Sequence, residues 1–139
     1  MTRKFKLDYT PDFDFLLLGI VSYEKDYRLS WEINEFLQMD LERVDDHKVK
    51  HKKSGKDLHF SCFVYTDESA YLNFKLLSNR SEMGPLIEGL KNIDYLLVII
   101  GEYTENLSVD LKKSLLKLES VQSCFILKPE NVKNSEIVL

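Results

Sequence analysis

The alternation of hydrophobic and polar positions along the chain gives way at residues 95–100 to Tyr-Leu-Leu-Val-Ile-Ile, a run without a polar residue. This run combines β-branched and aromatic residues, both of which are favoured in strands, and Gly101 closes it. A continuous apolar run of this length is typical of a strand that is buried on both faces. We therefore predict that residues 95–100 form a central strand.

Further strands are predicted on both sides of this run. Residues 58–65 and 71–77 alternate in polarity, and the five residues between them suit a turn, so the two segments predict a hairpin. Residues 13–22 predict a second buried strand, in which Gly19 marks a bulge or a close approach of the backbone. Weaker patterns predict strands at 5–9, 41–45 and 121–127.

Two segments have the spacing of amphipathic helices. Residues 27–38 form the first, with Asp26 as the expected N-cap. Its apolar stripe consists of Leu29, Ile33, Phe36 and Leu37. The second helix is marked by Leu107, Leu111, Leu115 and Leu118. Together the elements predict a single α+β domain over residues 1–139: a mostly antiparallel sheet of five to seven strands with two helices. The tail at 130–139 is predicted to be loosely held, with Ile137, Val138 and Leu139 able to dock.

The first helix also carries large side chains on the stripe opposite to its apolar one. Tyr27 and Trp31 lie there together with Asn34 and Gln38. Either another element packs on these aromatic side chains, or they form a surface that binds a protein, since Trp, Tyr and Arg dominate binding hot spots. On the second interpretation the protein-binding residues are Tyr27, Arg28, Trp31 and Asn34.

Residues 47–56 contain five lysines, two histidines and no acidic residue. Gly55 and the density of charge predict a loop between two strands. We interpret this loop as a solvated hairpin tip, with contact to an anion or to RNA as the alternative. The loop lacks the arginines and aromatic residues that read or stack on bases, which disfavours nucleic acid. The residues available for such contact are Lys48, Lys50, Lys52, Lys53 and, outside the loop, Arg80.

The segment 78–85 is a loop by composition, and two of its side chains allow two interpretations. Asn79 and Arg80 either anchor the following segment through bonds from side chain to backbone, or face an anionic group. With Asp94 and Tyr95 they are also candidates for lining a small-ligand or catalytic pocket.

The sequence contains no motif that indicates catalysis or metal binding. Its five glycines match neither a phosphate loop nor a dinucleotide fingerprint. His59 and Cys62 are three apart in a predicted strand and therefore lie on opposite faces. His47 and His51 lie among lysines, which repel a cation. We expect no cofactor and no metal, and we assign no catalytic residue. The sequence therefore favours a protein that is not an enzyme, although a pair of carboxylates brought together by folding would leave no sequence motif.

Composition places the chain among ordinary folded proteins, with 44% hydrophobic and 30% charged residues. The net charge of −4 gives no attraction to nucleic acid or to an anionic membrane. The longest apolar run, at 15–21, is too short to span a membrane. Cys62 and Cys124 both lie in apolar, strand-like surroundings. We expect them to be reduced thiols of a cytoplasmic protein, with a disulfide as the alternative.

Residues 87–95 resemble the motif of the IPExxxVDY family, small bacterial proteins of unknown function. Ile87, Asp94 and Tyr95 match this motif and Ile93 replaces its valine, whereas Ile87 is followed by Glu-Gly instead of Pro-Glu. The segments 26–34 and 77–81 are also similar to such proteins. The resemblance implies a shared fold, and it implies no activity, cofactor or catalytic residue.

These observations lead to one functional hypothesis and two alternatives. The hypothesis is a non-enzymatic interaction module that binds a protein partner or itself, through the first helix and the aromatic face of the hairpin at Phe63, Tyr65 and Tyr71. The first alternative is an RNA-associated factor that uses the loop 47–56. The second is a small-ligand or catalytic pocket near Asn79, Arg80 and Asp94.

Overall fold

The apolar run at 95–100 forms strand β5 (Tyr95–Gly101), which lies inside the sheet between β4 (Leu72–Ser78) and β1 (Leu16–Val21). Leu97 and Ile99 enter one hydrophobic core, and Leu96 and Val98 enter a second core on the opposite face. All four side chains are fully buried. The prediction of a central strand that is buried on both faces is therefore confirmed.

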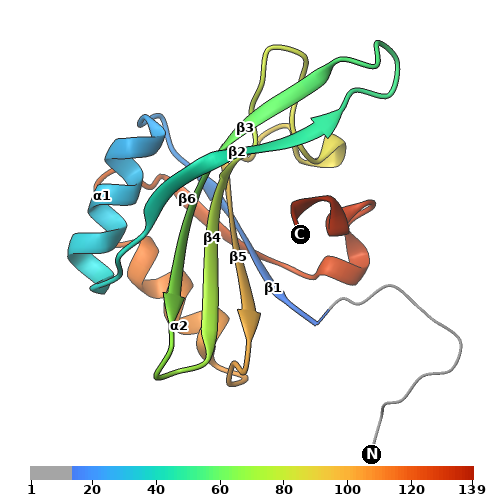
Figure 1. Ribbon diagram of the computed structural model, residues 1–139. Helices are drawn as coiled ribbons and strands as arrows, with labels where there is room; N and C mark the ends of the chain where they lie inside the picture. Colours follow the sequence, from blue (N-terminus) through green and yellow to red (C-terminus); the bar gives the residue numbers. More distant parts are fainter. Residues whose placement is uncertain (1–13) are drawn as a thin grey trace, which may run out of the picture.

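The computed structural model describes residues 14–139, which form one six-stranded antiparallel sheet with two helices (Figure 1). The strand order is β2-β3-β4-β5-β1-β6. The remaining elements are α1 (Asp26–Leu37), β2 (Glu42–Lys50), β3 (Asp57–Asp67), α2 (Leu107–Leu115) and β6 (Ser123–Leu127), with 3-10 turns η1 (Glu88–Leu90), η2 (Pro129–Asn131) and η3 (Ser135–Val138). This architecture confirms the predicted single-domain α+β fold. The strand expected at 5–9 lies outside the described residues.

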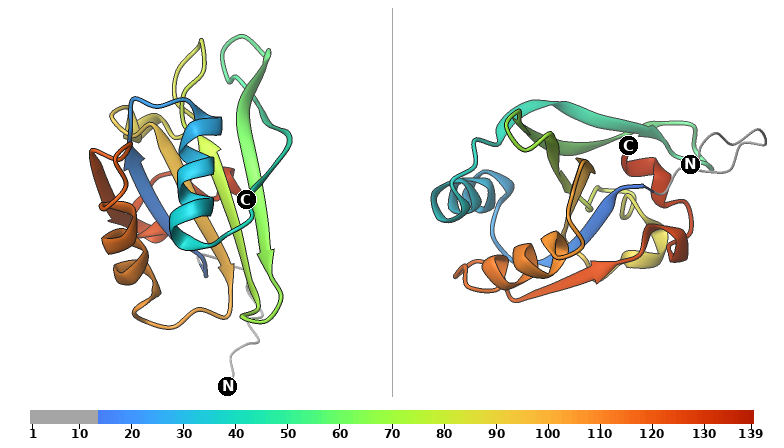
Figure 2. Two further views of the ribbon diagram at one scale, coloured as in Figure 1. Left: turned by 90° about the vertical axis from the view of Figure 1, so that its left-hand side faces the viewer. Right: turned by 90° about the horizontal axis from the view of Figure 1, so that it is seen from below.

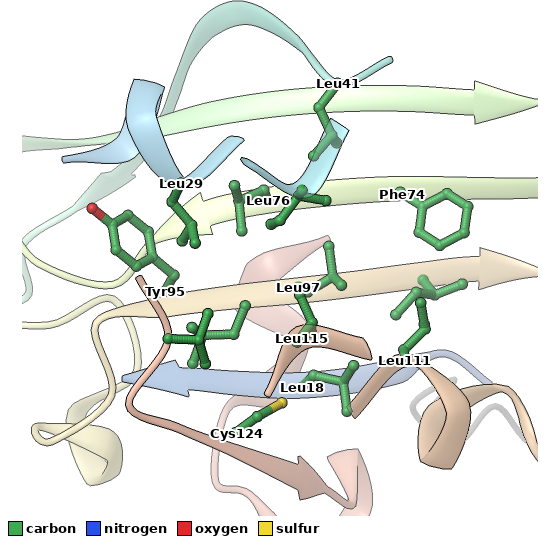
Figure 3. Packing of buried hydrophobic residues seen from close by; sticks show 14 of the residues in the cluster. Leu18, Leu29, Leu41, Phe74, Leu76, Tyr95, Leu97, Leu111, Leu115 and Cys124 are labelled. Atoms are coloured by element: carbon green, nitrogen blue, oxygen red, sulfur yellow. The ribbon is translucent and has the colours of Figure 1, made fainter. Parts of the chain in front are cut away.

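Different segments cover the two faces of the sheet. Both helices lie on one side of it, and the C-terminal 3-10 turns lie on the other (Figures 1 and 2). Figure 3 shows the helix side, where Leu29 of α1 and Leu111 and Leu115 of α2 pack towards Leu76 and Leu97 of the sheet. The second core includes Phe60, Leu96 and Val138. Hydrophobic burial therefore holds the sheet from both sides.

The segment 130–139 packs on the sheet through its apolar end, so it is held more firmly than the polar composition predicts. Val138 and Ser135 are fully buried, and Val138 belongs to the second core. His47 Nε2 lies 2.7 Å from the carbonyl oxygen of Ile137, and Lys75 Nζ donates to the carbonyl oxygen of Val138 at 3.0 Å. The segment is ordered because it covers an apolar sheet face that would otherwise meet water.

Strand β2 is longer than the sequence indicates. Residues 47–50, predicted as loop, pair in antiparallel register with 57–60 of β3, so that only 51–56 form the connection. Lysines are compatible with this position because β2 is an edge strand, where outward charged side chains stay solvated and discourage pairing with another chain.

Helix α1 is rotated slightly from the orientation that its apolar spacing predicts. Leu29 and Ile33 are fully buried as expected, whereas Phe36 is exposed and Ser30 is buried. The buried arc is therefore centred on Ile33 and extends towards Ser30, away from Phe36. Asp26 is the first helical residue and Lys25 the N-cap, one position earlier than predicted, and Asp26 Oδ1 accepts a bond from the Tyr27 amide at 2.7 Å.

Candidate functional site

The outward side of α1 presents three large aromatic side chains to solvent. Tyr27 is 64% exposed, Trp31 52% and Phe36 54%. The guanidinium carbon of Arg28 lies 5.0 Å from the centroid of the Trp31 ring, within cation–π range, and Arg28 Nε lies 3.3 Å from Glu32 Oε2. Arg28 therefore holds the indole in place from one side. We call Tyr27, Arg28, Trp31 and Phe36 the α1 surface.

A cavity of about 240 Å³ adjoins this surface, between α1 and the residues that follow α2. Trp31, Phe36 and Leu118 supply its apolar lining. Its charged lining consists of Glu32, Glu35, Lys117 and Glu119. The carboxylate of Glu32 also accepts bonds from the hydroxyl and the amide of Ser120, the latter at 3.4 Å. This link fixes the two walls of the cavity relative to each other.

Asn34, the fourth predicted binding residue, has a different position. Its Oδ1 accepts a bond from the Leu41 amide at 2.8 Å, and its Nδ2 donates to the Leu41 carbonyl oxygen at 3.1 Å. The side chain thus closes the connection from α1 to β2, after Gln38 has ended the helix in a left-handed conformation. The structure brings Tyr27, Arg28 and Trp31 together and leaves Asn34 out of the α1 surface.

The aromatic face of the hairpin is mostly covered. Phe63 is buried in the core beneath the helices, and the Tyr65 ring stacks on Phe74 with centroids 5.8 Å apart. Of the three aromatic residues predicted on this face, Tyr71 alone is largely exposed. It lies in the β3–β4 turn with a φ of 56°. Phe63 and Tyr65 therefore pack in or against the core on the helix side of the sheet.

Asn79 is fully buried, and it anchors the segment before β5. Its Oδ1 accepts a bond from the Ile87 amide at 3.0 Å, and its Nδ2 donates to the carbonyl oxygens of Leu90 at 2.8 Å and Ile93 at 2.9 Å. Every polar atom of the amide is engaged with backbone. This geometry corresponds to the anchoring interpretation of Asn79, and the full burial of the side chain keeps it from facing a ligand.

Arg80, Asp94 and Tyr95 border a cavity of about 310 Å³ at the N-terminal end of β5. Asp94 Oδ1 pairs with Arg80 Nε, and Asp94 Oδ2 accepts a bond from the Ser22 amide at 2.8 Å. The Tyr95 hydroxyl donates to the carbonyl oxygen of Glu24. Burial, reinforced by nearby carboxylates, raises the pKa of Tyr95 to about 12. Each oxygen of the Asp94 carboxylate thus accepts a hydrogen bond, and the Tyr95 phenol stays protonated at neutral pH.

The five cations predicted to contact an anion are divided among three places. Lys50, Lys52 and Lys53 line a groove at the hairpin tip. Lys48 is exposed on β2 and does not line this groove. Arg80 is paired with Asp94 in the neighbouring corner. Folding adds Lys91, which sequence reasoning did not connect with this loop because it lies forty residues further along the chain.

The remaining reactive groups are placed for packing. Cys62 and Cys124 are free thiols in different cores, and burial raises the pKa of both, that of Cys124 to about 11. Such thiols are poor nucleophiles at neutral pH. Among residues 14–139, no three His, Cys, Asp or Glu side chains are grouped to hold a metal ion. No helix in this part of the chain is long and apolar enough to cross a membrane.

The described residues thus define a small α+β protein with an exposed aromatic helix surface and a separate groove bordered by lysines. No protein-family model and no curated protein matches the chain.

Proposed function

We propose that the protein is a non-enzymatic interaction module that binds a protein partner, or a second copy of itself, through the α1 surface. The observation that supports this function is the position of Trp31, the single tryptophan of the chain. Its indole is half exposed and held against Arg28, next to a cavity. Trp, Tyr and Arg are the residue types that contribute most to binding hot spots, and clusters of exposed aromatic side chains are rare on monomers.

The energetics suit a reversible complex. Removing the exposed parts of Tyr27, Trp31 and Phe36 from water would contribute about 4 kcal/mol, which the loss of translational and rotational freedom offsets. Net affinity would therefore depend on polar contacts as well. Glu35 and Lys117, which border the adjoining cavity, are in position to make them. We expect a partner that inserts an apolar side chain between α1 and the end of α2.

The test begins with site-specific crosslinking in cells. A photoreactive amino acid replaces Trp31 in one variant and Phe125, an exposed aromatic residue of β6, in the matched control. A protein that crosslinks at position 31 and not at position 125 is then purified and its Kd measured. The Tyr27→Ala/Trp31→Ala variant should bind at least about tenfold more weakly, because each hot-spot truncation costs about 2 kcal/mol. Phe125→Ala should leave the Kd unchanged.

Self-association is measured on the same variants by sedimentation equilibrium. If the partner is a second copy, the wild type dimerises and the double variant is monomeric. Circular dichroism must show that Tyr27→Ala/Trp31→Ala keeps the native fold, since both side chains are more than half exposed. Unfolding of the double variant, or equal crosslinking at positions 31 and 125, would refute the proposal.

We also propose a cytoplasmic location, which the two free, buried thiols support because secreted domains of this size commonly use disulfides. Membership of the IPExxxVDY family stays a proposal as well, based on Ile87, Asp94 and Tyr95. An RNA-associated role has less support, because the lysines of the hairpin tip have no exposed aromatic side chain among them on which a base could stack.

A further inference from the structure

A groove of about 350 Å³ lies between the tip of the β2–β3 hairpin and the segment around η1. In the left view of Figure 2 the hairpin tip lies beside the yellow-green loop that leads to η1. The apolar lining of the groove comes from four separate segments. It consists of Val49, Leu58, Met83, Pro85, Leu86 and Ile137. These side chains are all aliphatic or thioether groups, so the floor provides a hydrophobic surface without a ring for stacking.

The rim of the groove is strongly basic. Lys50, Lys52, Lys53 and Lys91 border it, and Glu88 is the one acidic residue among its lining. Lys50 is paired with Asp57 at 3.1 Å. Among residues 14–139, no carboxylate lies within ion-pair distance of Lys52, Lys53 or Lys91. The chain as a whole is acidic, with a net charge of −4, so the groove is a local concentration of uncompensated positive charge.

We infer that this groove binds the anion of a medium-chain aliphatic acid, with the alkyl chain on the apolar floor and the carboxylate among Lys52, Lys53 and Lys91. The aliphatic floor does not favour nucleobases, which need aromatic partners. A volume of 350 Å³ is at the lower end of small-molecule pockets and holds about ten groups of the size of a water molecule or a methylene. Octanoate, with about ten non-hydrogen atoms, matches this volume and the distribution of charge.

This site goes beyond the proposed function and does not depend on it. The groove lies on the sheet face that the C-terminal turns cover, whereas α1 packs on the other face. Ile137 of η3 forms part of its wall, so the docking of the C-terminal segment helps to shape it. Loss of ligand binding here and loss of partner binding at Trp31 can therefore be separated by variants on opposite sides of the protein.

The test is an NMR titration of the isotope-labelled full chain with octanoate. Binding should shift the amide signals of Leu58, Leu86 and Ile137 in a saturable manner. Octanol, which keeps the chain and lacks the charge, and acetate, which keeps the charge and lacks the chain, should each bind at least about tenfold more weakly, since both halves of the ligand contribute. Vesicles of phosphatidylglycerol serve as a separate probe for recognition of a membrane surface.

Three variants locate the site. Lys52→Glu/Lys53→Glu should weaken octanoate binding about tenfold, whereas Lys48→Glu/Lys56→Glu should not, although it makes the same change of net charge in the same hairpin. Met83→Asp places a carboxylate on the apolar wall at an exposed position and should also weaken binding without unfolding the protein.

Four outcomes would overturn the inference. They are the absence of saturable shifts with octanoate, shifts confined to residues outside the groove, equal weakening by the two lysine pairs, and association with vesicles in place of octanoate. Octanoate binding that fails in Lys52→Glu/Lys53→Glu and Met83→Asp, and persists in Lys48→Glu/Lys56→Glu, would support it.

Discussion

Asn79 shows how one buried amide organises a loop. The segment 86–93 has little regular structure of its own, and its backbone groups still need partners because it packs against the sheet. Asn79 supplies three of these partners through its side chain, and its own amide donates to the Asp94 carbonyl oxygen at 2.9 Å. The start of β5 is therefore fixed by a side chain that lies sixteen residues earlier in the chain.

We expect Asn79→Ala to destabilise the protein by about 3 kcal/mol, because it leaves the buried Ile87 amide and the Ile93 carbonyl oxygen without their partners. The free energy of unfolding in urea measures this effect. Asn73→Ala is the matched control, since Asn73 is exposed and its amide oxygen accepts one bond, from Thr66, at 2.8 Å. It should cost less than about 0.5 kcal/mol. Equal effects of the two substitutions would contradict the anchoring role of Asn79.

Tyr95 makes stability depend on pH in the alkaline range. Burial, with the carboxylates of Asp26 and Asp94 next in order, raises the folded-state pKa of its phenol from 10 to about 12. Between these values the unfolded chain has released the proton and the folded chain retains it. The stabilisation is therefore complete below pH 10 and is lost as the pH rises towards 12.

Tyr95→Phe isolates this effect because phenylalanine has no proton to release. We expect the difference in unfolding free energy between wild type and Tyr95→Phe to decrease steadily from pH 10 to pH 12, as measured by urea denaturation at each pH. Taking the difference removes the contribution of Cys124, whose pKa is also raised, to about 11. A difference that does not vary with pH would contradict the raised pKa.

Among the helices and strands, those with strong local periodicity could be predicted from the sequence. The apolar run of β5, the alternation of β3 and β4 and the leucine spacing of α2 are signals within single segments. The extent of β2 could not be predicted, because residues 47–50 become a strand by pairing with β3 and their own composition indicates a loop. The rotation of α1 that exposes Phe36 could not be predicted either, because it depends on how the helix packs on the sheet.

The candidate sites follow the same division. Tyr27, Arg28 and Trp31 belong to one helix, so their common surface could be predicted from spacing alone. Asn34 has the same spacing, but its side chain bonds to Leu41 in the turn that follows the helix. Spacing within the helix could not predict these bonds. The lysine-bordered groove is assembled from the hairpin, the residues around η1 and the C-terminal segment, and no pattern within one segment indicates it.

Gly19 allows β1 to lie between β5 and β6. An added Cβ would lie 3.0 Å from Ile93 Cδ1 and 3.2 Å from Leu127 Cδ1. We expect Gly19→Ala to cost about 1–2 kcal/mol through overpacking. Gly89→Ala is the matched control, because its added Cβ would meet no heavy atom within 4 Å among the described residues, and it should change stability by less than about 1 kcal/mol. Thermal unfolding of both variants measures the contrast; a larger loss in Gly89→Ala would contradict it.

In the protein as a whole, each face of the sheet is apolar and is buried by other segments. The sequence predicts the segments that bury one of these faces only. The two amphipathic helices account for the first core. The second core is completed by the segment around η1 and by Val138, which is brought to it by two bonds from side chains to backbone, those of His47 and Lys75. The apolar triplet at 137–139 indicates that this end of the chain can dock, and it does not indicate on which face.

Val138 therefore should contribute to global stability although it lies one residue from the end of the chain. We expect Val138→Ala to lower the free energy of unfolding by about 2 kcal/mol, because the fully buried side chain loses contacts and leaves a cavity in the second core. Leu139→Ala, at a half-exposed neighbour, should cost less than about 0.5 kcal/mol. Hydrogen exchange extends the measurement: weaker protection should spread to Phe60 and Leu96, which share the second core, and not to Leu29 beneath the helices. If Val138→Ala changes neither stability nor protection, the C-terminal segment rests on the sheet without supporting it.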